Sequence, residues 1–305
     1  MTTFAKQILS DDLKLTKIKQ LPNNNHRPQT QYFTAITPKK DPVHIKITTA
    51  RVNNYEKIYP ITCNLYKMGY PLPKPIGLYQ IKNDHIIITS LLNGKSIQRQ
   101  QYDSINIIDQ DSLVDFVTDY FLNLKPLNQS SKQSELDYWT QDFFKNKIVG
   151  YLEKLNTSSI FPEIKKIASL IDNKFKLSSQ EYSLQHGDLY GCNIVYNSED
   201  KNYYLVDWDG VCHTSKYFDI ATFIVKTLHY PNLVNQIYSK IYKGLNNKEK
   251  VNLNSQITIA LIKEYKNLFT LDKTIIKIAR LAKYKKLLEE KLPQVIERYS
   301  QQLTF

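Results

Sequence analysis

Residues 184–210, LQHGDLYGCNIVYNSEDKNYYLVDWDG, place several carboxylate and amide side chains around two short apolar runs. The runs, residues 194–196 and 203–206, are β-branched and aromatic, and the polar residues between them favour a turn. The sequence therefore predicts a β-hairpin whose turn is centred near Asp200. In that register Asn193 and Asp207 face one another with side chains roughly 5 Å apart, at the open end of the hairpin.

These side chains predict a metal site and a base. Carboxylate and amide oxygens are hard ligands that suit Mg²⁺, which binds through a carboxylate or two and substrate phosphates. We therefore expect Asn193 and Asp207 to hold Mg²⁺. Asp188 lies in a loop with Gly187 and Gly191, which let the backbone fold back. A carboxylate beside bound metal and phosphate can accept the proton of an attacking hydroxyl, which is the base role in phosphoryl transfer from ATP.

Structural roles for the same residues are the alternative. A single aspartate in a turn is usually a solvated turn former, and a lone histidine is more often structural than catalytic. His186 is therefore expected to hydrogen-bond the backbone and fix the loop. The order of base, amide, hairpin and second aspartate is nevertheless that of a kinase catalytic loop followed by its metal-binding aspartate.

Three segments carry a resemblance to a known family. HGDLYGCN (186–193) resembles the HGDxxxxN motif of the aminoglycoside phosphotransferase and choline kinase superfamily, and LVDWDG (205–210) resembles its metal-binding segment. KYFDIATFI (216–224), with Asp219 before an apolar run, is similar to the next landmark, as found in choline-kinase-like and thiamine-kinase-like members. The resemblance implies an α+β, two-lobed protein-kinase-like fold that uses ATP and Mg²⁺ to phosphorylate hydroxyls of small molecules.

The first hundred residues predict a small β-rich lobe. Residues 31–37 and 43–48 are candidate strands joined by a turn, and Lys46 lies in the second. An alternating strand could simply expose Lys46 to solvent. However, Glu56 follows in an apparent helix that ends near Gly69, and a strand lysine paired with a helix glutamate orients ATP phosphates in kinases. We expect Lys46 and Glu56 to form that pair.

Residues 85–97, HIIITSLLNGKSI, predict a buried strand that runs into a turn at Gly94. They resemble the last strand and the adenine-contacting hinge of the family's small lobe. The resemblance places Ser90, Leu91 and Leu92 near adenine, mainly through backbone hydrogen bonds; a plain core strand is the alternative. Residues 21–33 contain no glycine where a kinase covers the phosphates with a Gly-rich loop, so a pseudokinase-like protein that binds nucleotide poorly also remains an alternative.

From about residue 104 the apolar pattern becomes helical. One stripe comprises Leu113, Phe116, Val117, Tyr120, Phe121 and Leu124. Further helices are expected within residues 135–155 and 164–177 and after residue 219, the last two near residues 275–282 and 291–303. The predicted division is a nucleotide-binding lobe, residues 1–93, and a mostly helical lobe, residues 94–305, in which the hairpin is embedded.

Asp209 is the candidate residue for recognising the acceptor. It follows Asp207 by two residues, where choline-kinase-like members carry an acidic residue, and an extended backbone turns it to the same side while Trp208 packs the other way. We expect Asp209 to bind the cation of an alcohol such as choline, ethanolamine or thiamine. A simple turn role for Asp209, and an aminoglycoside or sugar hydroxyl as acceptor, are the alternatives.

Charge and composition limit the partners. The 305-residue chain has a formal net charge of +12, but its lysines are spread along the sequence without a nucleic-acid-binding motif. Diffuse solvated charge is therefore favoured, although an anionic partner or a membrane surface also fits. No apolar run suits a signal peptide or a membrane span, and the three cysteines lack metal-ligand spacing, so a cytoplasmic protein with reduced thiols is expected.

Overall fold

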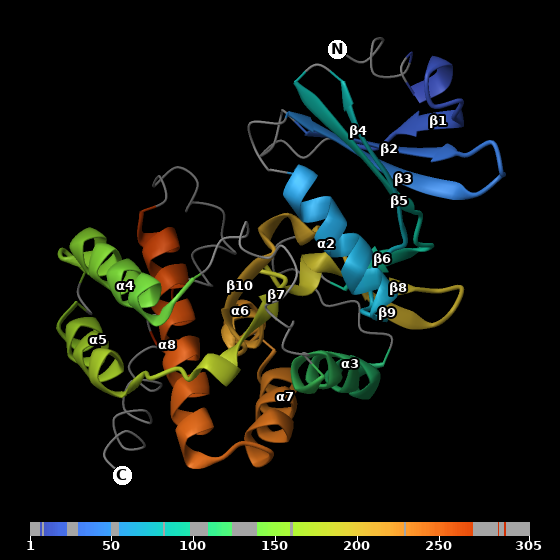
Figure 1. Ribbon diagram of the computed structural model, residues 1–305. Helices are drawn as coiled ribbons and strands as arrows, with labels where there is room; N and C mark the ends of the chain where they lie inside the picture. The colour runs from blue at the N-terminus through green and yellow to red at the C-terminus, as the bar shows by residue number, and fades with distance from the viewer. Residues whose placement is uncertain are drawn as a thin grey trace. The chain divides into compact units, whose positions relative to one another are not determined.

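The computed structural model describes residues 7, 9–22, 30–49, 55–81, 83–97, 109–123, 139–158, 161–228, 230–270, 286 and 290. These residues fall into two compact units (Figure 1). Unit 1 comprises Met1–Lys95 and Ile194–Asp209, and unit 2 comprises Ser96–Asn193 and Gly210–Phe305. The predicted hairpin therefore groups with the β-rich unit rather than with the helical residues.

Unit 1 is built on a five-stranded antiparallel sheet in the order β1-β2-β3-β5-β4. The strands are β1 (Thr16–Gln20), β2 (Thr30–Ile36), β3 (Pro42–Thr49), β4 (Pro75–Ile81) and β5 (Asp84–Ser90). Helix α2 (Tyr55–Lys67) follows β3 and packs against β4. Its end before Gly69, which has a φ of 83°, agrees with the predicted helix end.

The two faces of this sheet differ because side chains alternate along a strand. One face carries the apolar core, to which β3 contributes Val43, Ile45 and Ile47. The intervening residues of β3, among them His44 and Lys46, therefore lie on the opposite face. Phe33 of β2 belongs to the core, so Tyr32, paired with Lys46 across the strands, lies on the lysine face.

The hairpin strands β8 (Ile194–Asn197) and β9 (Asn202–Leu205) form a three-stranded sheet with β6 (Gly94–Ser96). Ile194 pairs with Leu205, whereas the predicted register requires Ile194 opposite Val206. The prediction was therefore wrong by one residue. The turn explains the shift, because Asp200 accepts the Asn202 N–H at 3.1 Å and Lys201 takes a φ of 59°, so the turn is centred half a residue earlier.

Unit 2 is mostly helical, which confirms the predicted α+β class. Its helices are α3 (Gln110–Leu122), α4 (Gln141–Leu155), α5 (Phe161–Lys174), α6 (Phe218–Lys226), α7 (Pro231–Lys243) and α8 (Asn247–Phe269). Helix α8 packs against α4, α5 and α6, while α3 packs against α7. A two-stranded antiparallel sheet joins β7 (Tyr182–Gln185) to β10 (Cys212–Ser215). The helices predicted near residues 275–282 and 291–303, and Leu124, lie outside the described residues.

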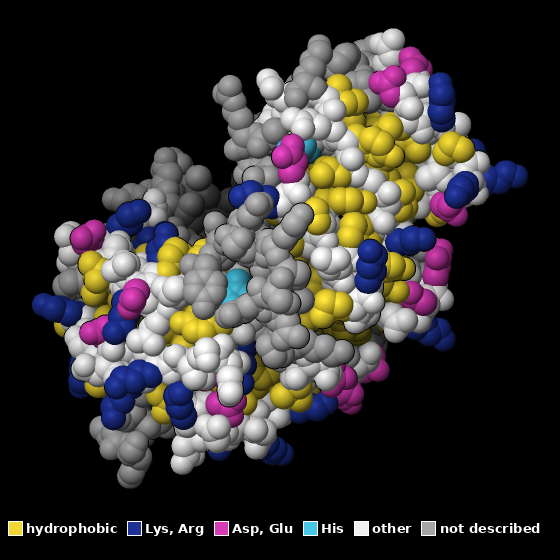
Figure 2. All heavy atoms as spheres, viewed as in Figure 1, with side chains coloured by type: hydrophobic (Ala, Val, Ile, Leu, Met, Phe, Trp, Pro, Cys, Tyr) yellow, Lys and Arg dark blue, Asp and Glu magenta, His cyan; other side chains and the backbone are white. Residues whose placement is uncertain are grey.

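Charged side chains of both signs lie on the face shown in Figure 2. Figure 2 shows Lys and Arg side chains spread over the visible face, with Asp and Glu side chains among them. Within the described part of the chain, no helix is long and apolar enough to cross a bilayer.

Candidate active site

The loop that follows β7 is fixed in unit 2 by one buried carboxylate. Asp219, in the first turn of α6, accepts the backbone N–H groups of His186 at 2.6 Å and Gly187 at 2.9 Å, and the Tyr120 hydroxyl at 2.8 Å. Burial raises the pKa of Asp219, while these hydrogen bonds act in the opposite direction. The contacts hold the two residues before Asp188 in a single conformation.

Gly187 is required by this conformation. Its φ is 84°, in the left-handed region that favours glycine. A Cβ atom added there would lie 1.8 Å from the carbonyl oxygen of Gly210. The chain can therefore pass from His186 to Asp188 only through a residue without a side chain.

The loop presents Asp188 and buries His186. The His186 side chain is fully buried, and its Nδ1 accepts the Asp188 N–H at 3.4 Å, which is the kind of backbone contact that the sequence suggested. The Asp188 side chain is 41% exposed, with Oδ1 3.3 Å from Lys226 Nζ. Of the two side chains, only that of Asp188 is accessible from solvent.

Asn193 closes the loop through its side-chain nitrogen. It ends the short 3₁₀ helix η3 (Gly191–Asn193), and its Nδ2 donates to the Asp188 carbonyl oxygen at 2.8 Å. Because the nitrogen is used in this way, the Asn193 side chain offers its oxygen for further contacts. An amide oxygen suits a hard cation.

A second polar group lies in unit 1 around Lys46. Its ammonium is 2.6 Å from Asp207 Oδ1 and also pairs with Asp209 Oδ2. Burial disfavours the Lys46 charge, but Asp207 and Asp209 together raise the pKa of the lysine above its usual value. Burial and the charge of Asp207 raise the pKa of Asp209, which Lys46 and a hydrogen bond from Tyr55 oppose.

The predicted pairing of Lys46 with Glu56 was wrong. Glu56 is exposed, and among the described residues it forms no ion pair with Lys46. The reason lies in α2, where Tyr55 is buried with its ring 5.7 Å from Lys46 Nζ. The next residue on a helix points about 100° away, so Glu56 faces solvent.

The side chains of Asp207 and Asp209 point in the same direction, as predicted, but the backbone between them is not extended. Asp207 has a φ of 62°, and the 3₁₀ helix η4 (Trp208–Gly210) follows it. This turn brings both carboxylates to Lys46. Trp208 is buried as expected, and its indole nitrogen donates to the Leu205 carbonyl at 3.0 Å.

A cavity of about 410 Å³ lies beside Lys46, entirely within unit 1. Its lining includes the predicted residues Lys46, Ser90, Leu91, Leu92, Asp207 and Asp209, but not Glu56. The Ser90 and Leu91 N–H groups are bonded to the carbonyl oxygens of Lys74 and Pro42, at 2.9 and 3.1 Å. Two of the three N–H groups expected to bind adenine are thus hydrogen-bonded within the protein.

Sequence reasoning missed most of the lining, including the polar residues Tyr32, His44 and Tyr55 next to Lys46. Burial and the Lys46 charge lower the pKa of His44 to about 4, so the imidazole is neutral near pH 7. Strand alternation could have found Tyr32 and His44, because they share a face with Lys46. No comparable signal singles out Tyr55. The glycine-free residues 23–29 lie outside the described part of the chain.

The predicted metal ligands fit a magnesium ion by their chemistry. Asp207 offers a carboxylate and Asn193 an amide oxygen, both of them ligand types that Mg²⁺ takes. No group of three or more His, Cys, Asp or Glu residues in the described ranges could hold a metal ion.

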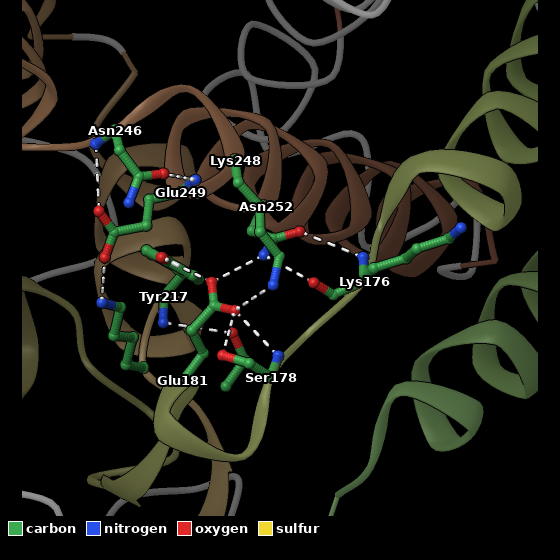
Figure 3. Close-up of polar contacts among 10 residues, drawn as sticks. Lys176, Ser178, Glu181, Tyr217, Asn246, Lys248, Glu249 and Asn252 are labelled. Atoms are coloured by element: carbon green, nitrogen blue, oxygen red, sulfur yellow. Dashed lines mark hydrogen bonds and ion pairs between the residues drawn. The ribbon is translucent and has the colours of Figure 1, made fainter.

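A polar network anchors the start of β7 (Figure 3). The buried Glu181 carboxylate accepts hydrogen bonds from the Ser178 N–H and hydroxyl at 2.9 and 2.8 Å. It also accepts the Tyr217 hydroxyl at 2.9 Å and Asn252 Nδ2 at 2.7 Å. Tyr217 immediately precedes α6 and Asn252 belongs to α8. The network therefore ties the strand that leads to His186 to both helices.

Solved structures share this fold, although no protein-family model and no curated protein sequence matches the chain. The amicoumacin kinase hAmiN, in complex with AMP-PNP, Ca²⁺ and Ami, is 15% identical, with a TM-score of 0.64 over 96% of this chain and 97% of that one. A choline/ethanolamine kinase family protein from Mesorhizobium loti is 11% identical, with a TM-score of 0.67 over 99% and 98%.

A Plasmodium vivax ethanolamine kinase is 13% identical, with a TM-score of 0.61 over 96% of this chain and 87% of that one. Aminoglycoside and macrolide phosphotransferases are also similar in structure. These are the two branches of the superfamily that the sequence motifs resemble. The chain therefore has the kinase-like fold that choline and ethanolamine kinases share with aminoglycoside phosphotransferases.

Proposed function

We propose that this protein is a phosphotransferase that moves the γ-phosphoryl group of ATP to the hydroxyl of a small molecule. The observation that carries the proposal is the position of Lys46, which is paired with Asp207 in a cavity that Ser90, Leu91 and Leu92 also line. A lysine and a metal-binding aspartate beside an apolar pocket are what a kinase needs to hold ATP.

In this mechanism the cavity of unit 1 holds the nucleotide. Its apolar walls would enclose adenine, and Lys46 would contact the phosphates in place of Asp207 while its pair with Asp209 keeps the ammonium oriented. Asp207 and Asn193 would hold Mg²⁺, which neutralises charge on the phosphates when bound. Tyr55 would keep Asp209 in place through its hydrogen bond.

Asp188 supplies the base. The acceptor oxygen forms a bond to the γ-phosphorus while the bond from that phosphorus to the β,γ-bridging oxygen breaks. ADP leaves, and the hydroxyl proton passes to the Asp188 carboxylate. The backbone contacts of Asp219 hold the loop that carries Asp188, and positioning of reacting groups supplies much of the rate in phosphoryl transfer.

The acceptor proposed from the sequence is a cationic alcohol such as choline, ethanolamine or thiamine, bound by Asp209. The ion pair with Lys46 weakens the support for this choice, because the Asp209 charge already has a partner. An aminoglycoside or sugar hydroxyl is the alternative acceptor. A pseudokinase-like binding role is the alternative function, supported by the absence of glycine in residues 21–33.

The test is phosphoryl transfer from γ-labelled ATP in the presence of Mg²⁺ to a panel of cationic alcohols, aminoglycosides, sugars and hydroxy acids. Label in one acceptor, above the hydrolysis seen without acceptor, supports the proposal. Tight ATP binding without transfer to any acceptor favours the binding role, and no binding of ATP contradicts both.

A further inference from the structure

Two lysines of unit 2 that the sequence did not single out lie on helices that pack together, Lys226 on α6 beside Asp188 and Lys263 on α8. Lys226 is the last residue of α6, and its Nζ is 3.3 Å from Asp188 Oδ1. The same ammonium lies 4.1 Å from the centre of the Tyr190 ring. The Lys226 side chain is only 22% exposed, so it is held against the loop rather than extended into solvent.

Lys263 adds a second positive charge from α8, which packs against α6. Its Nζ is 5.7 Å from the centre of the Phe218 ring. Among the described residues, Lys263 Nζ has no hydrogen bond and no ion pair. Burial lowers the pKa of Lys263, and the charge of Lys226 lowers it further, while Asp188 and Glu264 act in the opposite direction. The lysine is therefore partly dehydrated and close to another cation.

Several lysines of unit 2 are paired with a carboxylate of their own. Lys216 is 2.6 Å from Glu249 and Lys145 is 2.9 Å from Asp172. Lys226 instead lies 3.3 Å from Asp188, and the charge of the same carboxylate acts on Lys263, which also experiences the charge of Lys226. Partly buried cations that outnumber their counter-ions are unfavourable unless an anion joins them.

We propose that Lys226 and Lys263 form an anion-binding subsite beside Asp188, which takes the carboxylate or phosphate of an acidic hydroxy compound. The inference rests on the proposed function, because it identifies this compound as the acceptor. Its hydroxyl faces Asp188 while its acidic group contacts the two ammonium groups. The formal net charge of +12 also favours the approach of an anionic acceptor.

A different role for Lys226 makes a different kinetic prediction. If Lys226 served only to contact the transferred phosphoryl group, its loss would lower kcat for every acceptor alike. A subsite for the acceptor changes KM, and it does so only for acceptors that carry the acidic group.

The experiment uses the full chain and matched acceptors: short hydroxy acids against their primary amides, and sugar monophosphates against the free sugars. Choline and ethanolamine form a cationic arm. The variants are Lys226→Met, Lys263→Met and the double variant. Lys250→Met is the matched control, because Lys250 is also on α8 and contacts an aromatic ring, Tyr242, at 4.9 Å.

We expect transfer to favour one acidic acceptor over its neutral counterpart. KM for that acceptor should rise about tenfold or more in each lysine variant, the scale of a hydrogen bond to a charged group, and remain unchanged in Lys250→Met. Comparing the hydroxy acids with the sugar monophosphates shows whether the subsite takes a carboxylate or a phosphate. The inference would be overturned if a neutral or cationic acceptor were preferred and the lysine variants kept the parent KM. An equal fall in kcat for all acceptors would also overturn it.

A binding measurement separates this inference from the proposed function. Thermal unfolding is followed with the hydroxy acids, sugar phosphates and inorganic phosphate, in the presence of a non-hydrolysable ATP analogue. If no acceptor is phosphorylated, the proposed function fails. The subsite is then supported if the acids raise the unfolding temperature of the parent protein and not that of the double lysine variant. It is overturned if the acids do not raise the unfolding temperature of the parent protein.

Discussion

Single side chains decide how Lys46 is oriented. In this structure the lysine pairs with Asp207 and Asp209, and Glu56 points to solvent. The carboxylate that fixes a kinase lysine is expected on the helix that follows its strand. Here the turn after β9 supplies it, and Tyr55 occupies the buried position on α2.

This arrangement predicts opposite outcomes for two conservative substitutions. Asp209→Asn should weaken ATP-dependent turnover by about tenfold or more, because it removes a charge-assisted hydrogen bond to Lys46. Glu56→Gln should leave turnover unchanged and serves as the matched control. Steady-state kinetics with varied ATP measures both. A large loss in Glu56→Gln with a silent Asp209→Asn would show that the helix glutamate orients the lysine during catalysis.

At the scale of elements, the passage from β7 to α6 depends on one glycine. Gly187→Ala should lower the free energy of unfolding by more than about 1 kcal/mol, since it adds strain at positive φ and a clash with the Gly210 carbonyl. The measurement is denaturant unfolding.

Gly150→Ala is the matched control for Gly187→Ala. Gly150 lies within α4 with nothing within 4 Å of an added Cβ atom. Alanine there should raise stability by about 0.5–1 kcal/mol through helix propensity. Equal effects of the two substitutions would contradict the close approach of Gly187 to Gly210.

The Glu181 network predicts a pH-dependent contribution to stability. Burial opposes ionisation, but the hydrogen bonds from Ser178, Asn252 and Tyr217 hold the pKa of Glu181 below its usual value. A lowered carboxyl pKa stabilises the fold above the unfolded-state pKa, about 4.3 for Glu, and this stabilisation is lost as the pH falls through the folded-state pKa. Glu181→Gln should therefore cost about 1–3 kcal/mol at neutral pH.

The measurement is unfolding free energy as a function of pH for the parent protein and Glu181→Gln. The difference between them should be constant above about pH 5 and shrink at lower pH. Glu153→Gln, an exposed site on α4, is the control and should match the parent. A difference that is independent of pH would mean that packing, rather than the carboxylate charge, makes Glu181 important.

At the scale of the whole molecule, the element order and the fold class could be predicted because local patterns set them. The strand around Lys46, the helix that ends before Gly69 and the hairpin all follow from alternation, turn residues and apolar periodicity. The hairpin register could not be predicted to the residue, because one residue in the turn decides it. Contacts between distant segments, such as Lys46 with Asp209 or Lys226 with Asp188, leave no periodic signal in the sequence.

The net charge of +12 predicts how ATP reaches the protein. The association rate for ATP should fall as ionic strength rises from about 0.01 to 0.15 M, where the Debye length shortens from about 30 to 8 Å. Stopped-flow measurement with a fluorescent ATP analogue checks this, with sucrose at equal osmolarity as the control. A rate that does not depend on salt would contradict electrostatic steering.

The central claim is that Asp188 acts as the base in phosphoryl transfer, and one comparison tests it most directly. Transfer of label from γ-labelled ATP to the best acceptor is measured together with ATP affinity, for the parent protein, Asp188→Asn and the exposed-turn control Asp41→Asn. The account predicts a fall in turnover of about 10²-fold or more for Asp188→Asn, with ATP affinity retained and Asp41→Asn active. Full turnover in Asp188→Asn would contradict the account.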